Sequence, residues 1–398
     1  MLVRFVLHLT AACLLSLAAL PATAEEVPAT TRVVVLGVNH AAQLVSESDQ
    51  PAALAAFVTR VAPQAVCVER APEQFARNDH YEFTYEIQDI VVPLARVRGI
   101  SLCPFDWMPP AEDEVLGFGM SISTVPEVRP SRAFLAFPEP AALQRGLFHA
   151  DDRKNLAKVD DWIRNVPAQA SRDLPRRLYL YRTFLQAQRV AAAAKAHVGG
   201  TVLVVVGEFH KYDIEAILAS TPGIEVIQPS QIGLPSAEQI AAHDQRNYRL
   251  AIARFNLLGA QAATGNVDWN WIGRVLDVLT RESDDAEIAL LRTRYARLRG
   301  AMNRQNAIAS YREIAGRADA SRPAGWDGVL DRQRVDSYFD PFGNLRIDQR
   351  ARVEVARELG SEQADAVETI RAVLAKELTP RQSRQFDAYW ARDIVVER

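Results

Sequence analysis

Two histidines of this chain each stand three residues after a glycine that ends an apolar, valine-rich run: His40 after Gly37, and His210 after Gly207. Neither run alternates with polar residues, which is typical of a strand buried on both faces of a parallel sheet. A glycine at the end of such a strand lets the backbone turn sharply. Because parallel strands share one carboxyl edge, both imidazoles are predicted to meet in the crevice where open α/β sheets bind ligands.

Other apolar runs in the N-terminal half also end in polar residues. Glu69 and Arg70 end one run, Asp106 ends another, and Glu208 lies two residues before the second histidine. Arg70 is suited to bind a substrate carboxylate or a developing oxyanion, and equally to hold Glu69 in a structural ion pair. Asp106 belongs either to the same site or to the next turn, as a cap. We expect two imidazoles and up to three carboxylates at one edge.

This set of residues suits two kinds of hydrolytic chemistry. His40, Glu69 and His210 could bind a divalent metal such as Zn, Mn or Co, which would convert bound water into a hydroxide nucleophile. The same side chains could also work without a metal, one histidine taking a proton from water while a carboxylate orients its ring. The residue types do not decide between these mechanisms.

Further polar residues are placed to support the two histidines. Asn39 directly precedes the first of them, and Glu86 lies on a predicted helix, where it points either into the cleft or to solvent. With Asp106 and Glu208 they form the candidate supporting groups. The chain has no G-x-S-x-G elbow, no H-E-x-x-H and no P-loop, which argues against serine chemistry and nucleotide hydrolysis.

The elements that must position these residues alternate between strand and helix. The patterns predict strands at 32–37, 65–69, 100–106, 201–207 and 224–228. They predict helices at 50–61, 82–97, 174–197 and 212–219. In the third helix, Leu178, Tyr181, Leu185 and Val190 are expected on one apolar side. The order indicates an α/β fold with a mainly parallel sheet and flanking helices.

The chain is expected to divide into three parts. Residues 1–24 are interpreted as a signal peptide, residues 25–235 as the α/β domain, and residues 236–398 as a helical cap or subdomain that lies over the carboxyl edge. Within the α/β domain, the proline-rich stretch 108–140 breaks the rhythm and is interpreted as an insertion or functional loop.

The signal peptide prediction rests on Arg4, on an apolar stretch over 11–20, and on Ala22-Thr23-Ala24 as a cleavage site. Thr10 occupies the place where a lipobox needs leucine, so plain secretion is favoured over lipidation at Cys13. No later run approaches the eighteen apolar residues of a membrane helix. We therefore expect no integral membrane segment after cleavage and a periplasmic or secreted protein.

Charge and cysteine content narrow the choice of partners. Cleavage after residue 24 leaves 45 basic and 49 acidic side chains, a formal charge of −4, which makes nucleic acid an improbable partner. We expect Cys67 and Cys103 to be buried thiols, because neighbouring parallel strands seldom offer disulfide geometry, although an oxidising compartment permits a disulfide.

The order of these motifs resembles the superfamily of TraB and GumN proteins, Tiki proteases, erythromycin esterases and ChaN-like haem-binding proteins. The matching elements, over about residues 32–228, are Gly37-Val38-Asn39-His40, Val68-Glu69-Arg70, Glu86, Phe105-Asp106, Gln188-Arg189 and Gly207-Glu208-Phe209-His210. The resemblance implies an α/β fold with its site at the carboxyl edge, a functional role for Glu86 and Arg189, and hydrolysis, metal-dependent in the Tiki branch. Members often have Glu-Arg or Arg-Asn where this chain has Gln188-Arg189.

Two hypotheses of different classes arise from these residues. The first is a secreted hydrolase of a peptide or ester bond, with or without a metal, in which His40, Glu69 and His210 activate water while Arg70 and Arg189 bind an anionic or carbonyl group. The second is a non-catalytic protein that binds haem or another small ligand through its histidines. A degenerate scaffold is a third alternative. Substrate and oligomeric state are not predicted.

Overall fold

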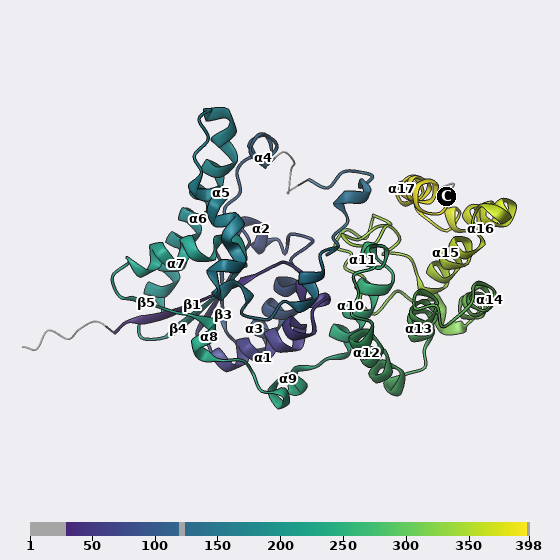
Figure 1. Ribbon diagram of the computed structural model, residues 1–398, viewed down its shortest axis with the longest axis horizontal. Coiled ribbons are helices and arrows are strands. Elements are labelled where there is room, and N and C mark those ends of the chain that lie inside the picture. Colours follow the sequence, from purple (N-terminus) through teal and green to yellow (C-terminus); the bar gives the residue numbers. More distant parts are fainter. Residues whose placement is uncertain (1–28, 119–123, 396–398) are drawn as a thin grey trace, which may run out of the picture.

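The computed structural model describes residues 29–118 and 124–395, so the predicted signal peptide lies outside the described residues. Five strands form one sheet of order β3-β2-β4-β1-β5, and every neighbouring pair is parallel. The strands are β1 (Thr31–Val38), β2 (Ala65–Val68), β3 (Ser101–Pro104), β4 (Thr201–Gly207) and β5 (Ile224–Ile227). The prediction of an α/β fold with a parallel sheet is confirmed (Figure 1).

Helices cover both faces of the sheet because its strands are apolar on both sides. Alternate residues of β1 pack in opposite directions: Val34 and Leu36 face α1 (Pro51–Val61), whereas Val33 and Val35 share a cluster with α6 (Ala170–Ala196). The remaining helices on the two faces are α3 (Val92–Arg98) and α7 (Lys211–Ala219) respectively. The sheet is thus the middle layer of three.

The strand order places a topological switch between β1 and β4. From β1 the chain proceeds to β2, on one side of this pair, whereas from β4 it proceeds to β5, on the other side. Connections that leave neighbouring parallel strands in opposite directions open a crevice at their carboxyl ends, and this is where doubly wound sheets bind ligands. The two Gly-x-x-His motifs end these two strands.

The side of α6 that faces the sheet is not the one predicted. Val190 is buried as expected, but Tyr181 is 53% exposed, and the stripe that faces the sheet carries polar side chains instead. These inward-facing residues include Tyr179, Thr183 and Gln186. An apolar helical pattern identifies the wrong side here because the inward polar groups satisfy one another at the end of the sheet.

The prediction that Cys67 and Cys103 are free thiols is wrong. The two residues lie directly opposite each other on the parallel strands β2 and β3, with Cα atoms 4.2 Å apart, and they form a disulfide. Their side chains leave the neighbouring strands on the same side, so the pleat brings the two sulfur atoms together. The bond joins the two strands that end at Glu69 and Asp106.

Short helices fill the connections around the carboxyl edge, and α4 shows that part of the predicted insertion 108–140 is helical. These are η1 (Ala42–Leu44), η2 (Glu47–Asp49), α2 (Pro72–Ala76), the π-helical η3 (Glu86–Val91), α4 (Ala111–Phe118), η4 (Ser131–Ala133), η5 (Pro140–Gln144), η6 (His149–Asp151), η7 (Arg153–Leu156), α5 (Ala157–Arg164) and η8 (Glu208–His210).

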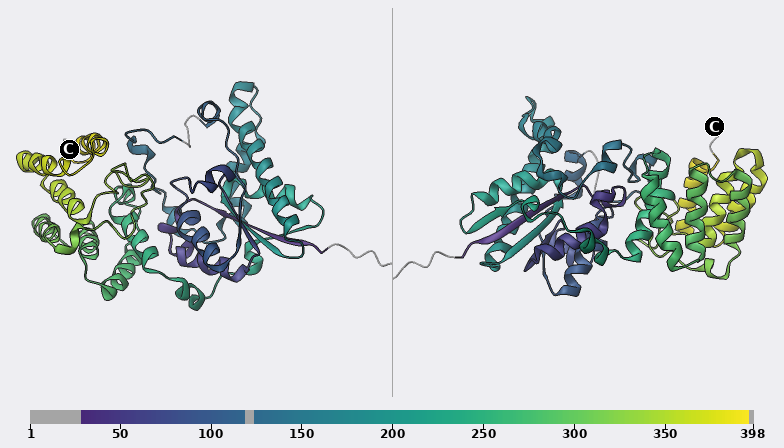
Figure 2. Two further views of the ribbon diagram at one scale, coloured as in Figure 1. Left: turned by 180° about the vertical axis from the view of Figure 1, so that it is seen from behind. Right: turned by 60° about the horizontal axis from the view of Figure 1, so that its bottom comes forward.

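The C-terminal region is mostly helical, as predicted. The helix α8 (Pro229–Ile232) precedes this region. The helices within it are α9 (Ala237–His243), α10 (Arg246–Leu257), α11 (Ala260–Thr264), α12 (Trp269–Glu282), α13 (Ala286–Leu298), α14 (Arg304–Ala315), η9 (Ala318–Ser321), α15 (Ile347–Leu359), η10 (Ser361–Gln363), α16 (Ala364–Ala375) and α17 (Pro380–Asp393). Several of them pack side by side (Figure 2).

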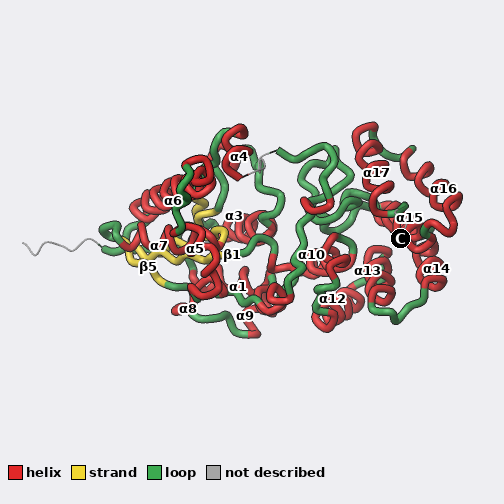
Figure 3. The backbone as a smooth tube through the Cα atoms, turned by 45° about the horizontal axis from the view of Figure 1, so that its top comes forward, coloured by secondary structure: helices red, strands yellow, loops and turns green. Residues whose placement is uncertain are grey.

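The sheet occupies one end of the molecule and the C-terminal helices the other (Figure 3). The apolar core beneath α1 continues into the helical region, where it includes Phe255 and Trp390. Among the described residues, no helix is both long and apolar enough to cross a membrane.

Candidate active site

The ring of His40 is fixed from behind by Glu86. Its Nδ1 lies 2.7 Å from Glu86 Oε1, and Glu86 Oε2 accepts the backbone N–H of Ala41 at 3.2 Å. A carboxylate only accepts, so Nδ1 carries the hydrogen of this contact and Nε2 is directed away from it. Phe83 packs on the same ring with centroids 5.2 Å apart. Glu86, which is fully buried at the start of η3, therefore points toward His40 and not to solvent.

The ring of His210 is fixed in an equivalent way by a hydroxyl group. Thr183 Oγ1 donates its hydrogen to the carbonyl of Tyr179 at 2.8 Å and lies 2.7 Å from His210 Nδ1. Because a hydroxyl has one hydrogen, Thr183 must accept from Nδ1–H, which leaves the lone pair on Nε2. Tyr179 stacks on the imidazole, with centroids 4.8 Å apart.

Glu69 lies between the two imidazoles. Its Oε2 is 3.7 Å from His40 Nε2, and its Oε1 is 3.8 Å from His210 Nε2. Both oxygens already accept hydrogen bonds, Oε1 from Arg182 Nη2 at 2.7 Å and Oε2 from the backbone N–H of Gly207 at 2.5 Å. The structure thus brings together the three residues that the sequence singled out as a His/Glu/His set.

Arg182 completes the group and is itself held by Asp106. Its Nε and Nη2 donate to Asp106 Oδ1 and Oδ2 at 2.8 and 2.7 Å, a two-point contact that fixes the guanidinium plane. The third nitrogen, Nη1, lies 3.3 Å from His210 Nε2. Tyr81 and Gln186 also donate to Asp106, each at 2.8 Å. Burial alone would raise the pKa of Asp106, but Arg182 and these hydrogen bonds hold it below its usual value.

The two histidines have opposite pKa shifts. Burial disfavours the charged form of His40, but the carboxylates of Glu86 and Glu69 outweigh it and raise the pKa from 6.5 to about 9. Burial, followed by the positive charge of Arg182, lowers the pKa of His210 from 6.5 to about 4. At neutral pH, His40 is therefore an imidazolium and His210 a neutral imidazole.

The two motif glycines are required for close packing. Neither has a positive φ, so the backbone conformation at these two positions does not require glycine. A Cβ at Gly207 would lie 3.0 Å from His40 Nε2 and 3.2 Å from Glu69 Oε2, and one at Gly37 would lie 2.8 Å from the Cβ of Ala150. Any side chain at position 207 would occupy the space between the reactive groups.

Two arginines singled out in the sequence point elsewhere. Arg70 donates to the backbone carbonyl and the carboxylate of Asp79, at 2.5 and 2.7 Å, and its guanidinium lies 3.9 Å from the ring centre of Tyr81. Arg189 donates to the backbone carbonyl of Asp106. Neither lines the pocket between the histidines. The cation at the site is Arg182, which lies about two helical turns before Arg189 on α6.

The remaining candidates lie at the margin of the site. Asn39 and Glu208 both line the pocket, and Glu208 is paired with Arg145. Four residues of the site were not predicted from the sequence: Arg182, Thr183, Tyr179 and Tyr81. The first three share one face of α6 with Gln186 at helical spacing, a polar stripe within a long helix, and that stripe was the available signal.

The groups enclose a pocket of about 170 Å³, whose lining includes both histidines, Glu69, Arg182, Phe83 and Phe209. All its lining residues lie between positions 38 and 210, so the C-terminal helices do not form its walls. Among the residues that the structure describes, no three His, Cys, Asp or Glu side chains are grouped as a metal site. The arrangement offers a proton donor, a proton acceptor and a fixed cation around one small space.

Comparison with known proteins adds no family to this geometry: no protein-family model matches the chain, and neither the curated proteins nor the solved structures give a match.

Proposed function

We propose that this protein is a hydrolase that cleaves an ester or peptide bond by adding water at the His40–Glu69–His210 site. The observation that carries the proposal is that the pKa values of the two histidines are shifted in opposite directions. They face one carboxylate from opposite sides, yet one is held charged and the other neutral. A pair of titratable groups whose pKa values are forced apart supplies an acid and a base at one pH.

In this mechanism His210 is the base and His40 the acid. The lone pair on His210 Nε2 takes a proton from water as its oxygen attacks the carbonyl carbon. The imidazolium of His40 gives the hydrogen on Nε2 to the leaving oxygen or nitrogen. Thr183 and Glu86 position these rings through Nδ1 and so decide which nitrogen faces the substrate.

Arg182 is suited to stabilise the oxyanion that forms during attack. Asp106 holds it through Nε and Nη2, so Nη1 is the nitrogen left for substrate. Without substrate, Nη1 lies against His210 Nε2. A carbonyl oxygen that accepts this N–H would free the histidine lone pair at the moment it is needed. Fixed donors of this kind contribute about 3 kcal/mol or more to acyl transfer.

The contacts around Glu69 favour a metal-free form of this chemistry. A metal bound by His40, Glu69 and His210 would have to replace the hydrogen bonds that Arg182 and Gly207 give to Glu69. It would also lie beside the guanidinium, which is 3.3 Å from His210 Nε2. The chemistry of the donors suits Zn, Mn or Co, but this arrangement does not, and no step of the proposal passes through a metal.

The rival function, binding of haem or a similar ligand, receives less support. The pocket of about 170 Å³ is smaller than the sites that enclose drug-sized ligands, and a carboxylate and a guanidinium occupy the space between the imidazoles. It suits the reacting part of a substrate better than a macrocycle.

We also propose that the protein works outside the cytoplasm. The disulfide between Cys67 and Cys103 supports the secretion predicted from residues 1–24, since structural disulfides persist in oxidising compartments. N-terminal sequencing of the protein after expression in a Gram-negative host tests this, and a mature chain that still begins at Met1 would count against it.

The catalytic proposal is tested with protein purified without chelator, analysed for metals and assayed on nitrophenyl esters and fluorogenic peptides. His210→Gln should lower kcat/KM by about 10²–10⁴-fold. His197→Gln, at the far end of α6, is the matched control and should keep full activity. Unchanged activity in His210→Gln would sink the proposal. A Soret band on haem titration, lost in His40→Ala and with no hydrolysis of any substrate, would establish the rival.

A further inference from the structure

A second, larger cavity lies next to the pocket between the histidines. Its volume is about 640 Å³, within the range of sites that enclose most of a small molecule, whereas the histidine pocket falls below that range. It is lined by Arg70 and by residues from three chain segments: 79–83, 124–136 of the insertion, and 330–338 of the C-terminal region. A substrate too large for the histidine pocket needs such a space for the part that does not react.

The two cavities share a wall formed by Tyr81 and Phe83. The two rings stack with centroids 5.7 Å apart and an interplanar angle of 8°. Phe83 packs on His40, and Tyr81 donates to Asp106, which holds Arg182. A molecule that lies along this wall in the large cavity is therefore next to the side chains that position His40 and Arg182.

The lining of the large cavity is chiefly apolar, with one unbalanced charge. Its apolar side chains include Phe83, Val125, Phe134, Leu135 and Tyr338. Its carboxylates are all paired: Asp79 with Arg70, Glu82 with Arg129, and Asp331 with Arg381. Arg132, which is exposed, forms no ion pair with any other described residue. The lining thus offers an apolar surface and a single free positive charge.

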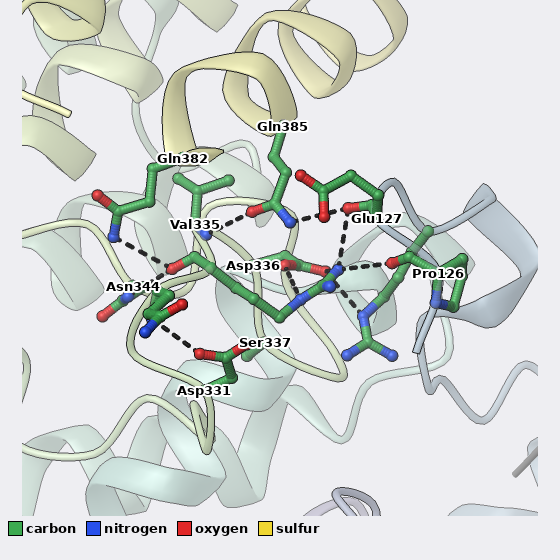
Figure 4. Close-up of polar contacts among 12 residues, drawn as sticks. Pro126, Glu127, Asp331, Val335, Asp336, Ser337, Asn344, Gln382 and Gln385 are labelled. Atoms are coloured by element: carbon green, nitrogen blue, oxygen red, sulfur yellow. Dashed lines mark hydrogen bonds and ion pairs between the residues drawn. The ribbon is translucent and has the colours of Figure 1, made fainter. Parts of the chain in front are cut away.

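A network of polar contacts fixes the walls before any ligand arrives. Arg129 joins Glu82 to Asp336, at 2.5 and 2.7 Å, and Leu135 N–H donates to the Tyr338 carbonyl at 2.8 Å. Behind this, Arg334 binds Asp336 and the Pro126 carbonyl, and Gln385 of α17 bridges Val335 and Glu127 (Figure 4). The C-terminal helices thereby hold both the insertion and their own segment in place.

We propose that this cavity binds the non-reacting part of the substrate, an apolar group that carries a negative charge. That the bound molecule is a substrate rests on the proposed hydrolysis. The binding site itself is defined by the cavity, the shared aromatic wall and the unpaired Arg132. It assigns a role to the C-terminal region, which takes no part in the histidine pocket.

Binding is tested with the fluorescent apolar anion anilinonaphthalene sulfonate and its neutral relative phenylnaphthylamine. Both dyes should bind the wild type and the inactive His210→Gln variant equally, with one dye per chain. Leu135→Trp, which fills the cavity, should weaken both dyes by about tenfold or more. Arg132→Ala changes an exposed side chain, so we expect the fold to be kept and only the binding of the anion to weaken, by about tenfold.

Arg281→Ala, an exposed arginine on α12, is the matched control and should change neither dye. Equal binding of the anion to the wild type and to both cavity variants would overturn the proposal. So would a loss of both dyes in Arg132→Ala.

A pair of nitrophenyl esters, acetate and decanoate, links the cavity to the chemistry. Leu135→Trp should lower kcat/KM about tenfold or more for the decanoate while leaving the acetate unchanged. Dye binding that agrees with the prediction without any hydrolysis would retain the cavity as a ligand site and reject the catalytic proposal. Hydrolysis by the wild type, together with dye binding that is unchanged in both cavity variants, would retain the catalytic proposal and reject the cavity as a ligand site.

Discussion

The α/β half and the helical half both bury arginines against carboxylates, but the surroundings of these ion pairs differ. In the helical half, Arg350 is fully buried and binds Asp340, Glu354 and the carbonyl of Leu258. In the α/β half, Arg182 is bound equally firmly by Asp106, yet one of its nitrogens faces a pocket with two histidines.

The difference shows what separates a structural ion network from one that can do chemistry. Every nitrogen of Arg350 ends on a protein acceptor, so its charge stabilises only the fold. Around Arg182, the partners hold the guanidinium but leave Nη1, His40 Nε2 and His210 Nε2 near an open space. The same substitution in the two places should therefore have different effects.

Arg182→Met should have the largest effect, because it removes a cation from the reactive groups and also leaves Asp106 buried without its main partner. We expect kcat/KM to fall by about 10²–10³-fold and the free energy of unfolding by about 3–5 kcal/mol. Urea unfolding and steady-state kinetics on the same preparation measure both. Arg177→Met, an exposed position on the same helix, should change neither quantity. Full activity in Arg182→Met would show that the Arg182 network is structural, like that of Arg350.

Arg350→Met should reproduce the loss of stability without the loss of activity. The change leaves the buried carboxylate of Asp340 without its ion-pair partner, whereas Glu354 keeps Arg294 and Arg357, and we expect a cost of about 3–5 kcal/mol. Below the unfolding transition, kcat/KM should equal that of the wild type. Arg352→Met, on the same helix but with surface ion pairs, should cost at most about 1 kcal/mol. A fall in kcat/KM without unfolding would show that the helical network acts on the site.

Replacing both Cys67 and Cys103 by alanine should lower the stability of the α/β half more than that of the helical half. The disulfide closes a loop between residues 36 positions apart, so its loss should lower the free energy of unfolding by about 4 kcal/mol. Because the bond joins the strands that end at Glu69 and Asp106, we expect the α/β half to lose protection first. Amide hydrogen exchange measures this by region, and equal loss in α15 would argue against it.

Of these changes, Glu86→Gln should have the smallest effect on kcat/KM at neutral pH, but it should lower kcat/KM clearly at alkaline pH. The mechanism needs neutral His210 and charged His40, so kcat/KM of the wild type should be flat from about pH 4 to about pH 9 and fall on either side. The variant removes the main charge that raises the pKa of His40, so the alkaline limb should move to lower pH by about 1–3 units. An unmoved alkaline limb would assign it to another group.

The position of the site could be predicted from the sequence, because the information is local to each strand. An unbroken apolar run defines a buried strand, and the glycine and histidine after it mark the carboxyl end of that strand. Parallel strands have only one carboxyl edge, so Glu69 and Asp106 are placed by the same reasoning. None of this requires knowledge of which strands are neighbours.

Features that depend on register could not be predicted. Whether Cys67 faces Cys103 depends on the alignment of two strands, which neither strand encodes alone. Arg182 rather than Arg189 reaches Glu69 because α6 turns its polar stripe toward Asp106, against its apolar pattern. The rotation of a helix about its axis is decided by the partners that it finds.

The strand order has a consequence for how the protein reaches its native state. The strand β4 lies between β1 and β2, so these two earlier strands never pair with each other and are joined only through β4. It also enters the sheet only after the chain has passed the insertion and the length of α6. Contacts between residues so far apart in sequence form slowly, because a long loop must close before any pairing is gained. Because His40 follows β1 and His210 follows β4, the two imidazoles come together only when β4 pairs with β1, and a chain without this central strand has no continuous core.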